Sequence, residues 1–241
     1  MLSARLFEDE GAEAIATTSA VLAWAHGYRD GEELPIDTLV NAVSEITARV
    51  SIPTSVDFER GYANDPQEVA ALVERLLNAG AVGVNLEDAA ASPQALADKI
   101  KAVRARVGSR VFINARTCIV LQGKVRGDNV ASEVIERARL FEAAGADGLF
   151  VPRLTDPAAI RAVTRAVKLP LNIVELPGLP AFEELAALGV RRLSAGPHLG
   201  QVAYAAAVAA TRSWLGHNDA LPHNADLDYP RANALFGSRQ T

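Results

Sequence analysis

Residues 76–86 read Leu76-Leu77-Asn78-Ala79-Gly80-Ala81-Val82-Gly83-Val84-Asn85-Leu86: the end of an apolar helical stripe, a glycine, and a short apolar run. A glycine just past a helix permits the left-handed backbone that ends it, and an apolar run of four or five residues is typical of a buried strand. The same order of features recurs at residues 6–16, 141–151 and 185–194. The chain therefore alternates helices and strands in repeated units.

Helix starts are marked as clearly as helix ends. A side-chain acceptor is followed by proline at Asp65-Pro66, Ser92-Pro93 and Asp156-Pro157, which predicts an N-cap and a first helical residue at each place. Glu68, three residues after Asp65, predicts a capping box there. Between these marks we expect strands at 14–17, 54–58, 82–86, 111–115, 148–152, 171–174 and 192–195.

Seven strand-helix units without a Pro- or Gly-rich linker favour a (β/α)8 barrel of the TIM type over an open, doubly wound sheet. The chain opens at residues 1–5 already on a helix, so we expect the first strand of the barrel to be missing at the N-terminus. We predict one barrel domain over 1–215. The polar residues 216–241 are expected to form a C-terminal tail that docks on the barrel or on a neighbouring subunit.

Composition excludes several classes of partner. Lys plus Arg is 24 and Asp plus Glu is 29, a formal charge of −5, which argues against binding nucleic acid or anionic lipid. The longest charge-free run, 193–211, is broken by glycine and proline, so we expect no membrane span. The single cysteine, Cys118, cannot form an intrachain disulfide, which favours a reducing, cytoplasmic location.

Charged residues follow three successive predicted strands. Asp57 and Glu59 are two apart and should share one face, Glu87 ends the next strand, and Arg116 ends the one after it. The carboxyl ends of barrel strands meet at one mouth, where such carboxylates repel one another unless a cation neutralises them. Oxygen ligands suit Mg²⁺, and an arginine beside the ion can hold a substrate carboxylate. We therefore predict an enzyme for a small oxo or hydroxy acid.

The alternative is that an acid at a strand end is a solvated loop residue or a helix N-cap. We favour that interpretation for Asp88, and for Asp30 when it is taken on its own. The combined spacing of the carboxylates and Arg116 favours a site.

Three stretches, 55–62, 80–88 and 113–117, read SVDFERGY, GAVGVNLED and INART. They resemble the isocitrate lyase/phosphoenolpyruvate mutase superfamily, and the resemblance covers about residues 1–210. It implies a Mg²⁺-dependent barrel, with Mn²⁺ as a possible substitute, that stabilises the enolate of a pyruvate-like unit and makes or breaks a C–C or P–C bond.

The resemblance also implies roles for individual residues. Asp57 would coordinate the ion, Glu59 and Glu87 would hold it directly or through water, and Arg116 would bind the substrate carboxylate. The turn of Thr18, Ser19 and Ala20 would donate hydrogen bonds to the oxo acid. Asp30 would reach the water shell of the ion as a catalytic group, and Asn172 would contact the substrate.

Departures from the family pattern narrow the activity. The lyases carry a cysteine loop after the Glu-Asp pair, whereas residues 89–93 here read AAASP. Phosphoenolpyruvate mutase has a longer loop there and a histidine where this chain has Pro152. The short loop resembles the branch that includes oxaloacetate decarboxylase. We predict a carbon–carbon lyase acting on oxaloacetate or a substituted malate through an enolate. The alternatives are a phosphonomutase-type enzyme and a non-catalytic oxo-acid binding protein.

Three further residues lie near the predicted mouth. We interpret Cys118 as a small buried hydrophobic residue and leave Arg153 and His198 outside the site. The resemblance implies assembly through the last helices, so we expect a homodimer or homotetramer.

Overall fold

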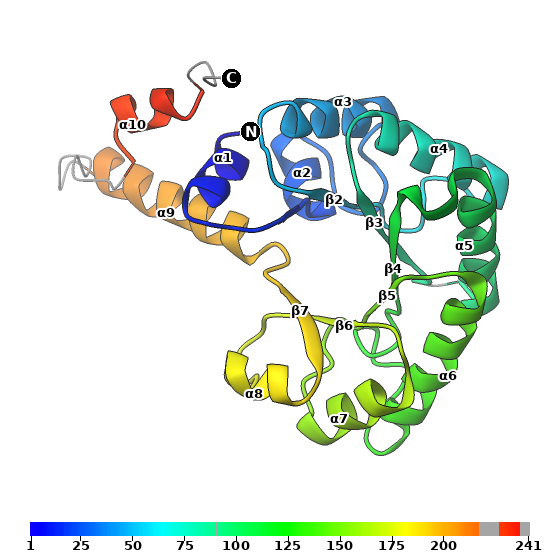
Figure 1. Cartoon of the computed structure of the whole chain (residues 1–241). Helices are drawn as coiled ribbons and strands as arrows, with labels where there is room; N and C mark the ends of the chain where they lie inside the picture. The colour runs from blue at the N-terminus through cyan, green and yellow to red at the C-terminus, as the bar shows by residue number, and fades with distance from the viewer. Residues whose placement is uncertain (90, 217–226, 237–241) are drawn as a thin grey trace.

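The computed structural model describes residues 1–89, 91–216 and 227–236. Within them, seven parallel strands pair in sequence order to form one curled sheet. The strands are β1 (Ile15–Ala16), β2 (Thr54–Asp57), β3 (Gly83–Glu87), β4 (Phe112–Arg116), β5 (Gly148–Phe150), β6 (Leu171–Val174) and β7 (Val190–Ser194). No described strand joins β7 to β1, so the fold is a TIM-type barrel with one strand missing, as predicted (Figure 1).

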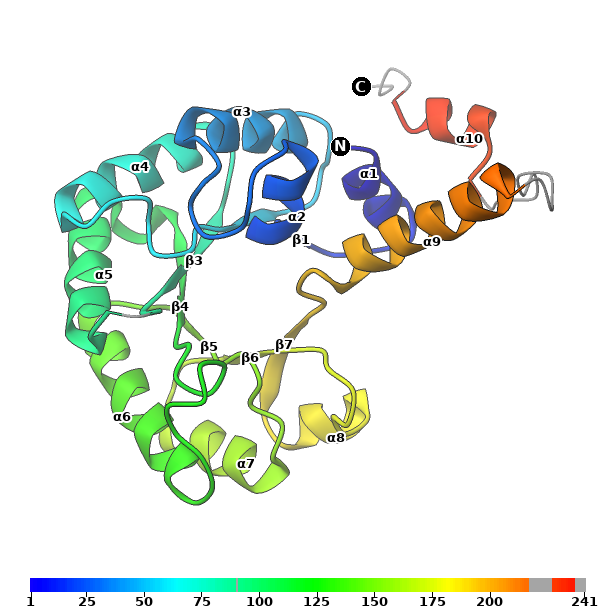
Figure 2. The ribbon, with the colours of Figure 1, turned by 180° about the vertical axis from the view of Figure 1, so that it is seen from behind.

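The helices form a layer outside the sheet (Figure 2). They are α1 (Leu2–Asp9), α2 (Ser19–Ala25), α3 (Ile36–Thr47), α4 (Pro66–Asn78), α5 (Pro93–Val107), α6 (Asn129–Ala144), α7 (Pro157–Ala166), α8 (Phe182–Ala187), α9 (His198–Leu215) and α10 (Tyr229–Ala234), with a 3₁₀ turn at Gly108–Arg110. No helix in the described residues combines the length and the apolar character needed to span a bilayer.

Most predicted strand positions agree with the structure to within one or two residues. The differences reach two residues at the end of β5, which stops at Phe150, and at the start of β7, while β1 is shorter by one residue at each end. β1 contains only Ile15 and Ala16, and β7 begins at Val190, because its ladder with β6 starts directly after the turn at Gly189.

The predicted caps form at two of three helices. The Ser92 hydroxyl accepts from the Ala95 N–H, and the Asp156 carboxylate accepts from the N–H groups of Ala158 and Ala159. The capping box at Asp65 is wrong: Asp65 occupies the N-cap position of α4, but its exposed side chain makes no cap hydrogen bond. Solvent competes for an exposed carboxylate, and the helix start depends on Pro66 and the backbone.

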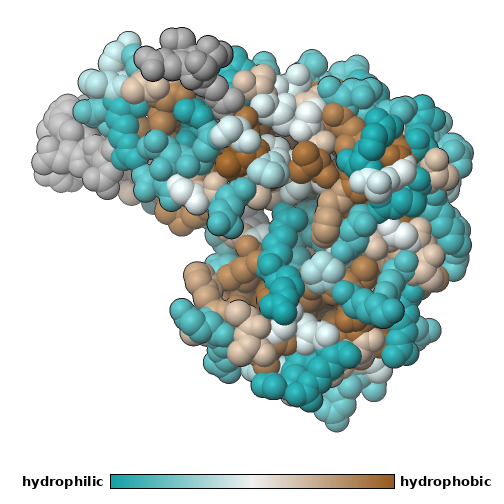
Figure 3. Space-filling model, viewed as in Figure 1, coloured by the Kyte–Doolittle hydropathy of each residue, from teal (hydrophilic) through white to brown (hydrophobic). Residues whose placement is uncertain are grey.

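The core lies between the outer face of the sheet and the helices. Strand residues such as Val84, Leu86 and Ile113 are buried against Val69 and Leu76 of α4. Gly61, with φ +104°, brings the loop after β2 onto this layer, because a Cβ there would lie 2.8 Å from Val69 Cγ1. Figure 3 shows the mainly hydrophilic outer rim over α4 and α5.

The inner face of the sheet carries amides, where barrels usually carry branched apolar side chains. Asn114 Nδ2 donates to Asn85 Oδ1 at 2.8 Å and to Asn172 Oδ1 at 3.0 Å. Gly148 on the neighbouring strand leaves room, since a Cβ there would lie 2.8 Å from Asn114 Oδ1. The amides link β3, β4 and β6 across the lumen.

The last helices lie away from the ring. α9 contains no buried residue, and its apolar side chains, including Val202 and Trp214, are exposed (Figures 1 and 2). α10 contacts α1: Arg231 Nη2 lies 2.5 Å from Glu10 Oε1, and Arg5 Nε donates to Leu235 O at 2.7 Å. The described part of the tail therefore lies on α1, while residues 217–226 and 237–241 fall outside the described residues. The predicted domain boundary at 215 stays a prediction.

Replacing Asn114 with leucine tests the amide network. The change removes the partner of both buried asparagines, and we expect it to lower the free energy of unfolding by about 1–3 kcal/mol. Chemical denaturation measures this. Asn78→Leu, at the exposed end of α4, is the matched control. Equal effects of the two changes would contradict a stabilising role for the network.

Candidate active site

Asp57 is the last residue of β2 and faces the lumen. Its backbone N–H donates to Thr17 Oγ1 at 3.0 Å, and Ser19 Oγ donates to Asp57 Oδ2 at 3.4 Å. The other oxygen, Oδ1, is buried and has no hydrogen-bond partner among the described residues. A buried carboxylate oxygen without a donor is costly unless another group pairs with it. This oxygen is therefore available to a cation.

Glu59 lies beside Glu87 because the Glu87 N–H donates to the Glu59 carbonyl at 2.8 Å. The Glu59 backbone is left-handed, with φ +48°, and its side chain is buried. Burial raises the pKa of Glu59 to about 7, and the negative charges of Asp30, Asp57 and Glu32 add to this, while a hydrogen bond from the Glu32 N–H opposes it. Among the described residues, no ion pair with a positively charged side chain offsets these effects on Glu59.

Glu87 ends β3 and contacts Arg116, which ends β4. Arg116 Nη1 lies 2.9 Å from Glu87 Oε2 and 3.8 Å from Asp57 Oδ2. Burial raises the pKa of Glu87, whereas Arg116 lowers it. The pKa of Arg116, which burial alone would lower, is raised overall by Asp57 and Glu87, so the guanidinium stays charged. It also lies over the Phe150 ring, 5.5 Å from the centroid.

Arg116 Nε is buried without a hydrogen-bond partner among the described residues. A guanidinium can bind a carboxylate through two parallel N–H groups. Arg116 keeps one such donor free of protein partners, next to the carboxylates of Asp57 and Glu87.

The other predicted site residues lie at different distances from the carboxylates of Asp57 and Glu59. Thr18 is the N-cap of α2, Ala20 is buried in its first turn, and Ser19 reaches Asp57. Asp30 lies exposed in the loop after α2 and adds negative charge at Glu59. Asn172 is 2 % exposed, and its amide nitrogen donates to Ile173 O and Ser194 Oγ within the lumen network. The roles assigned to these residues stay predictions.

Asp88 corrects the sequence interpretation. It is 1 % exposed, and its carboxylate accepts from Arg137 Nη1 at 2.6 Å, Thr117 Oγ1 at 2.8 Å and the Cys118 N–H at 2.8 Å. Asp88 is therefore neither a solvated loop acid nor a helix cap. Its ion pair with α6 fixes the ends of β3 and β4, because a buried charge needs such partners.

The three further residues near the predicted mouth have different surroundings. Cys118 is buried, burial raises the pKa of its thiol to about 12, and its Sγ donates to Glu87 Oε2 at 3.5 Å. Arg153 is exposed with a left-handed backbone. His198 Nδ1 lies 3.3 Å from Glu175 Oε2 at the start of α9.

Sequence reasoning missed Arg192 of β7. Its Nη2 donates to Ser55 Oγ on β2 at 3.1 Å, so the side chain crosses the lumen below Asp57. Burial lowers the pKa of Arg192, and Asp57 opposes that effect. The strand alternation that places Arg192 on the same face as Ser194 is the one signal that could have indicated it.

The oxygen atoms at the mouth suit a hard divalent ion that keeps most of its bound water molecules. The atoms available to an ion are carboxylate and hydroxyl oxygens, and Asp57 Oδ1 has no hydrogen-bond partner within the described ranges. No three His, Cys, Asp or Glu side chains of the described residues lie close enough together to hold an ion jointly. Direct binding by Asp57, with Glu59 and Glu87 acting through water, fits this arrangement better than three direct carboxylate ligands.

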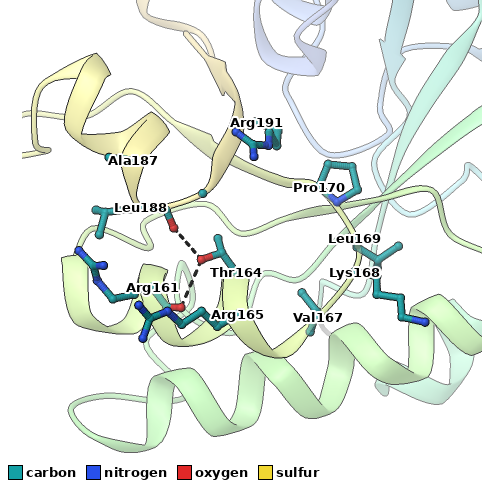
Figure 4. Close-up of a pocket in the computed structure, with 11 residues that line it drawn as sticks. Arg161, Thr164, Arg165, Val167, Lys168, Leu169, Pro170, Ala187, Leu188 and Arg191 are labelled. Carbon is teal, nitrogen blue, oxygen red and sulfur yellow. Dashed lines mark hydrogen bonds between the residues drawn. The ribbon is translucent and has the colours of Figure 1, made fainter.

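A larger hollow, of about 410 Å³, opens at the opposite ends of β6 and β7 (Figure 4). Its described lining includes Arg161, Arg165, Lys168 and Arg191 and no acidic residue. Its described lining therefore offers a cation no carboxylate and surrounds it with positive charge. A smaller hollow of about 90 Å³ borders the mouth at Glu87, and its described lining includes Glu32, Arg60 and Lys99 but not Asp57, Glu59 or Arg116. The candidate active site is therefore the mouth.

Comparisons with known proteins match most of the chain. The family model described as phosphoenolpyruvate phosphomutase matches residues 1–215. An uncharacterised protein of Mycobacterium tuberculosis is 36 % identical over 214 residues, 86 % of this chain and 79 % of the relative. The oxaloacetate decarboxylase of a Bradyrhizobium strain is 31 % identical, over 80 % of this chain and 68 % of its own. The crystal structure of a proposed phosphonomutase from Burkholderia cenocepacia superposes with a TM-score of 0.82 at 38 % identity, covering 87 % and 89 % of the two chains.

The raised pKa of Glu59 predicts a pH dependence of stability in the metal-free protein. Between pH 4.5 and 7 the folded state binds more protons than the unfolded state, so the free energy of unfolding falls as the pH rises. We expect wild type to lose on the order of 2 kcal/mol relative to Glu59→Gln across this range. Denaturation in chelator at several pH values measures it. The exposed Glu33→Gln is the control, and parallel profiles for wild type and Glu59→Gln would contradict the prediction.

Proposed function

The chain belongs to the phosphoenolpyruvate phosphomutase family, within the isocitrate lyase/phosphoenolpyruvate mutase superfamily, and we propose that it is a Mg²⁺-dependent carbon–carbon lyase. The substrate would be a small 2-oxo or 2-hydroxy carboxylic acid, such as oxaloacetate or a substituted malate, cleaved through an enolate. Mn²⁺ is the alternative ion.

The observation that carries this proposal is the position of Arg116 between Asp57 and Glu87. Arg116, together with Arg192 below Asp57, supplies two positive charges against the three carboxylates of Asp57, Glu59 and Glu87, and a divalent cation would supply what is lacking. Arg116 Nε and Asp57 Oδ1 are both buried and have no hydrogen-bond partner in the part of the chain that the structure describes. A substrate carboxylate would pair with the first, and the ion with the second.

The residues of the chain would share the work as follows. Arg116 would bind and orient the substrate carboxylate, and the Ser19 hydroxyl would turn from Asp57 Oδ2 to donate to the oxo group. When bound, Mg²⁺ is a Lewis acid that favours negative charge on an adjacent substrate oxygen. Asp30, at the exposed rim, would hold water near Glu59. The short connection 89–93 contains no cysteine, so we infer that solvent supplies the proton that completes the reaction.

Relatives support this choice within the family. The similar Bradyrhizobium protein is named an oxaloacetate decarboxylase. A phosphonomutase-type reaction is the second candidate, which the similarity to the Burkholderia cenocepacia structure favours. The third alternative is an oxo-acid binding protein without turnover.

Purified protein incubated with oxaloacetate and Mg²⁺ tests the lyase proposal. We expect pyruvate release above the rate of free metal, abolished by chelator. Asp57→Asn and Arg116→Lys should each lower the rate about 100-fold or more, because the first weakens ion binding and the second loses the bidentate guanidinium.

Arg139→Lys, on the exposed face of α6, is the matched control and should leave the rate unchanged. Absence of chelator-sensitive pyruvate release would argue against the lyase. Conversion of phosphonopyruvate, followed by phosphorus NMR, would then support the mutase, and ligand binding without turnover would support the binding protein.

We also propose that the protein is a cytoplasmic homodimer or homotetramer without nucleic-acid or membrane partners. Its one thiol is free, and its net charge is −5. The exposed apolar side chains along α9 include Val202 at 67 % and Trp214 at 59 %. Apolar surface of this extent favours burial against a second copy.

Replacing Val202 with glutamate tests this assembly. A charge placed on a buried apolar interface is costly, so we expect the mass in light scattering after size exclusion to fall to that of one chain. Phe182→Glu, on α8 and 69 % exposed, is the control for an apolar residue outside the proposed interface. A monomeric wild type would contradict the proposal.

A further inference from the structure

Glu32 joins two loops at the mouth, and both its backbone and its side chain take part. Its N–H donates to Glu59 Oε1 at 2.9 Å. Its own carboxylate accepts from the Tyr62 N–H at 2.8 Å through Oε1 and lies 2.7 Å from Arg60 Nη2 through Oε2. One residue of the loop after α2 thus contacts three residues of the loop after β2.

The backbone at this junction is held in an unfavourable conformation. Glu32, Glu59 and Tyr62 have φ values of +67°, +48° and +59°. Residues other than glycine rarely adopt this region, and they keep it only where surrounding contacts hold them there. The contacts of Glu32 connect all three residues.

Electrostatics show why Glu59 needs such a contact. Asp30, Asp57 and Glu32 all place negative charge near Glu59, and the hydrogen bond from the Glu32 N–H favours the ionised form of its carboxyl group. Arg60 neutralises the Glu32 carboxylate, so that this carboxylate can lie close to Glu59. Without these contacts, repulsion would turn the Glu59 side chain away from the mouth.

The loop after β2 is anchored on its other side as well. Lys99 of α5 donates from Nζ to Arg60 O at 2.6 Å and to Ala63 O at 2.8 Å. The Tyr62 ring stacks on Phe58, with centroids 5.4 Å apart. The loop after α2, which carries Asp30, is therefore joined to a fixed support.

We propose that Glu32 is a positioning residue that holds Glu59 at the mouth, toward the water shell of the divalent ion. The proposal rests on the function proposed above. Glu32 itself does not touch the ion or the substrate. It sets the place of the Glu59 carboxylate, which would face the water shell of the ion, and it ties the loop that carries Asp30 to the same frame.

Mg²⁺ binding to the purified protein, measured by titration calorimetry, tests this role without any turnover. Groups that orient metal ligands from outside typically change metal affinity by about 10- to 100-fold when they are removed. We expect Glu32→Ala to weaken Mg²⁺ binding about 10-fold or more. Glu32→Gln should restore most of the affinity, because the amide oxygen still accepts from the Tyr62 N–H.

Glu33→Ala is the matched control. Glu33 is the next residue of the same loop, exposed and paired only loosely with Arg29 at 3.9 Å, and its removal should leave Mg²⁺ affinity unchanged. Hydrogen exchange at the Glu32 and Tyr62 amides reports separately whether the contacts form. Both amides should be protected in wild type, and the Tyr62 amide should lose protection in Glu32→Ala.

The outcomes separate the two proposals. Unchanged Mg²⁺ affinity in Glu32→Ala, with the Tyr62 amide deprotected, would show that Glu32 supports the loop without positioning a metal ligand, and would overturn the inference. A wild type with protected amides and no Mg²⁺ affinity would refute the metal-dependent function, and the role of Glu32 toward the ion would fall with it. If Glu32→Ala does not fold, Glu32→Gly, which tolerates the positive φ, takes its place.

Discussion

The ion pair of Arg116 with Glu87, and its longer contact with Asp57, organises the mouth of the barrel. Carboxylates buried together destabilise a fold unless positive charge lies among them. Arg116 supplies one such charge, and its own pKa rises in response. Glu59 forms no ion pair with Arg116 in the structure, and burial raises the pKa of the Glu59 carboxyl group to about 7. The mouth therefore carries an excess of negative charge that is suited to a divalent cation.

Side chains in the lumen below the mouth stabilise the incomplete ring of strands. β1 and β7 each leave one edge unpaired by any described strand, and open edges are usually covered or closed. The amides of Asn85, Asn114 and Asn172 connect strands through the interior, and Arg192 reaches from β7 to Ser55 on β2. These contacts hold both sides of the curl together, so the carboxylates on β2 and β3 keep their positions relative to the later strands.

Local patterns predicted the architecture well, because glycine after a helix and proline after an N-cap are signals within a few residues. The same patterns predicted that the carboxylates and Arg116 lie close together, because the carboxyl ends of parallel strands meet at one edge of the sheet. The pairing of Asp88 with Arg137, 49 residues apart, and of Arg192 with Ser55, 137 residues apart, left no such signal. Strand alternation indicates which way a side chain faces but not which partner it meets. Glu32 was missed for the same reason, because its contacts depend on the path of two irregular loops.

The two ion pairs of Arg116 differ in length, and this difference suggests different roles for Glu87 and Asp57. Its contact with Glu87 is short, at 2.9 Å, whereas that with Asp57 is 3.8 Å. A ligand that entered the mouth would displace the longer contact first, since an ion pair weakens with distance. Glu87 would then keep the guanidinium in place while Asp57 turned to a cation and Arg116 Nε to an anion. Asp57 Oδ1 and Arg116 Nε, two of the buried atoms that have no hydrogen-bond partner among the described residues, are the atoms that this exchange would employ. Under the proposed function, the short ion pair would orient the guanidinium and the long ion pair would open for binding.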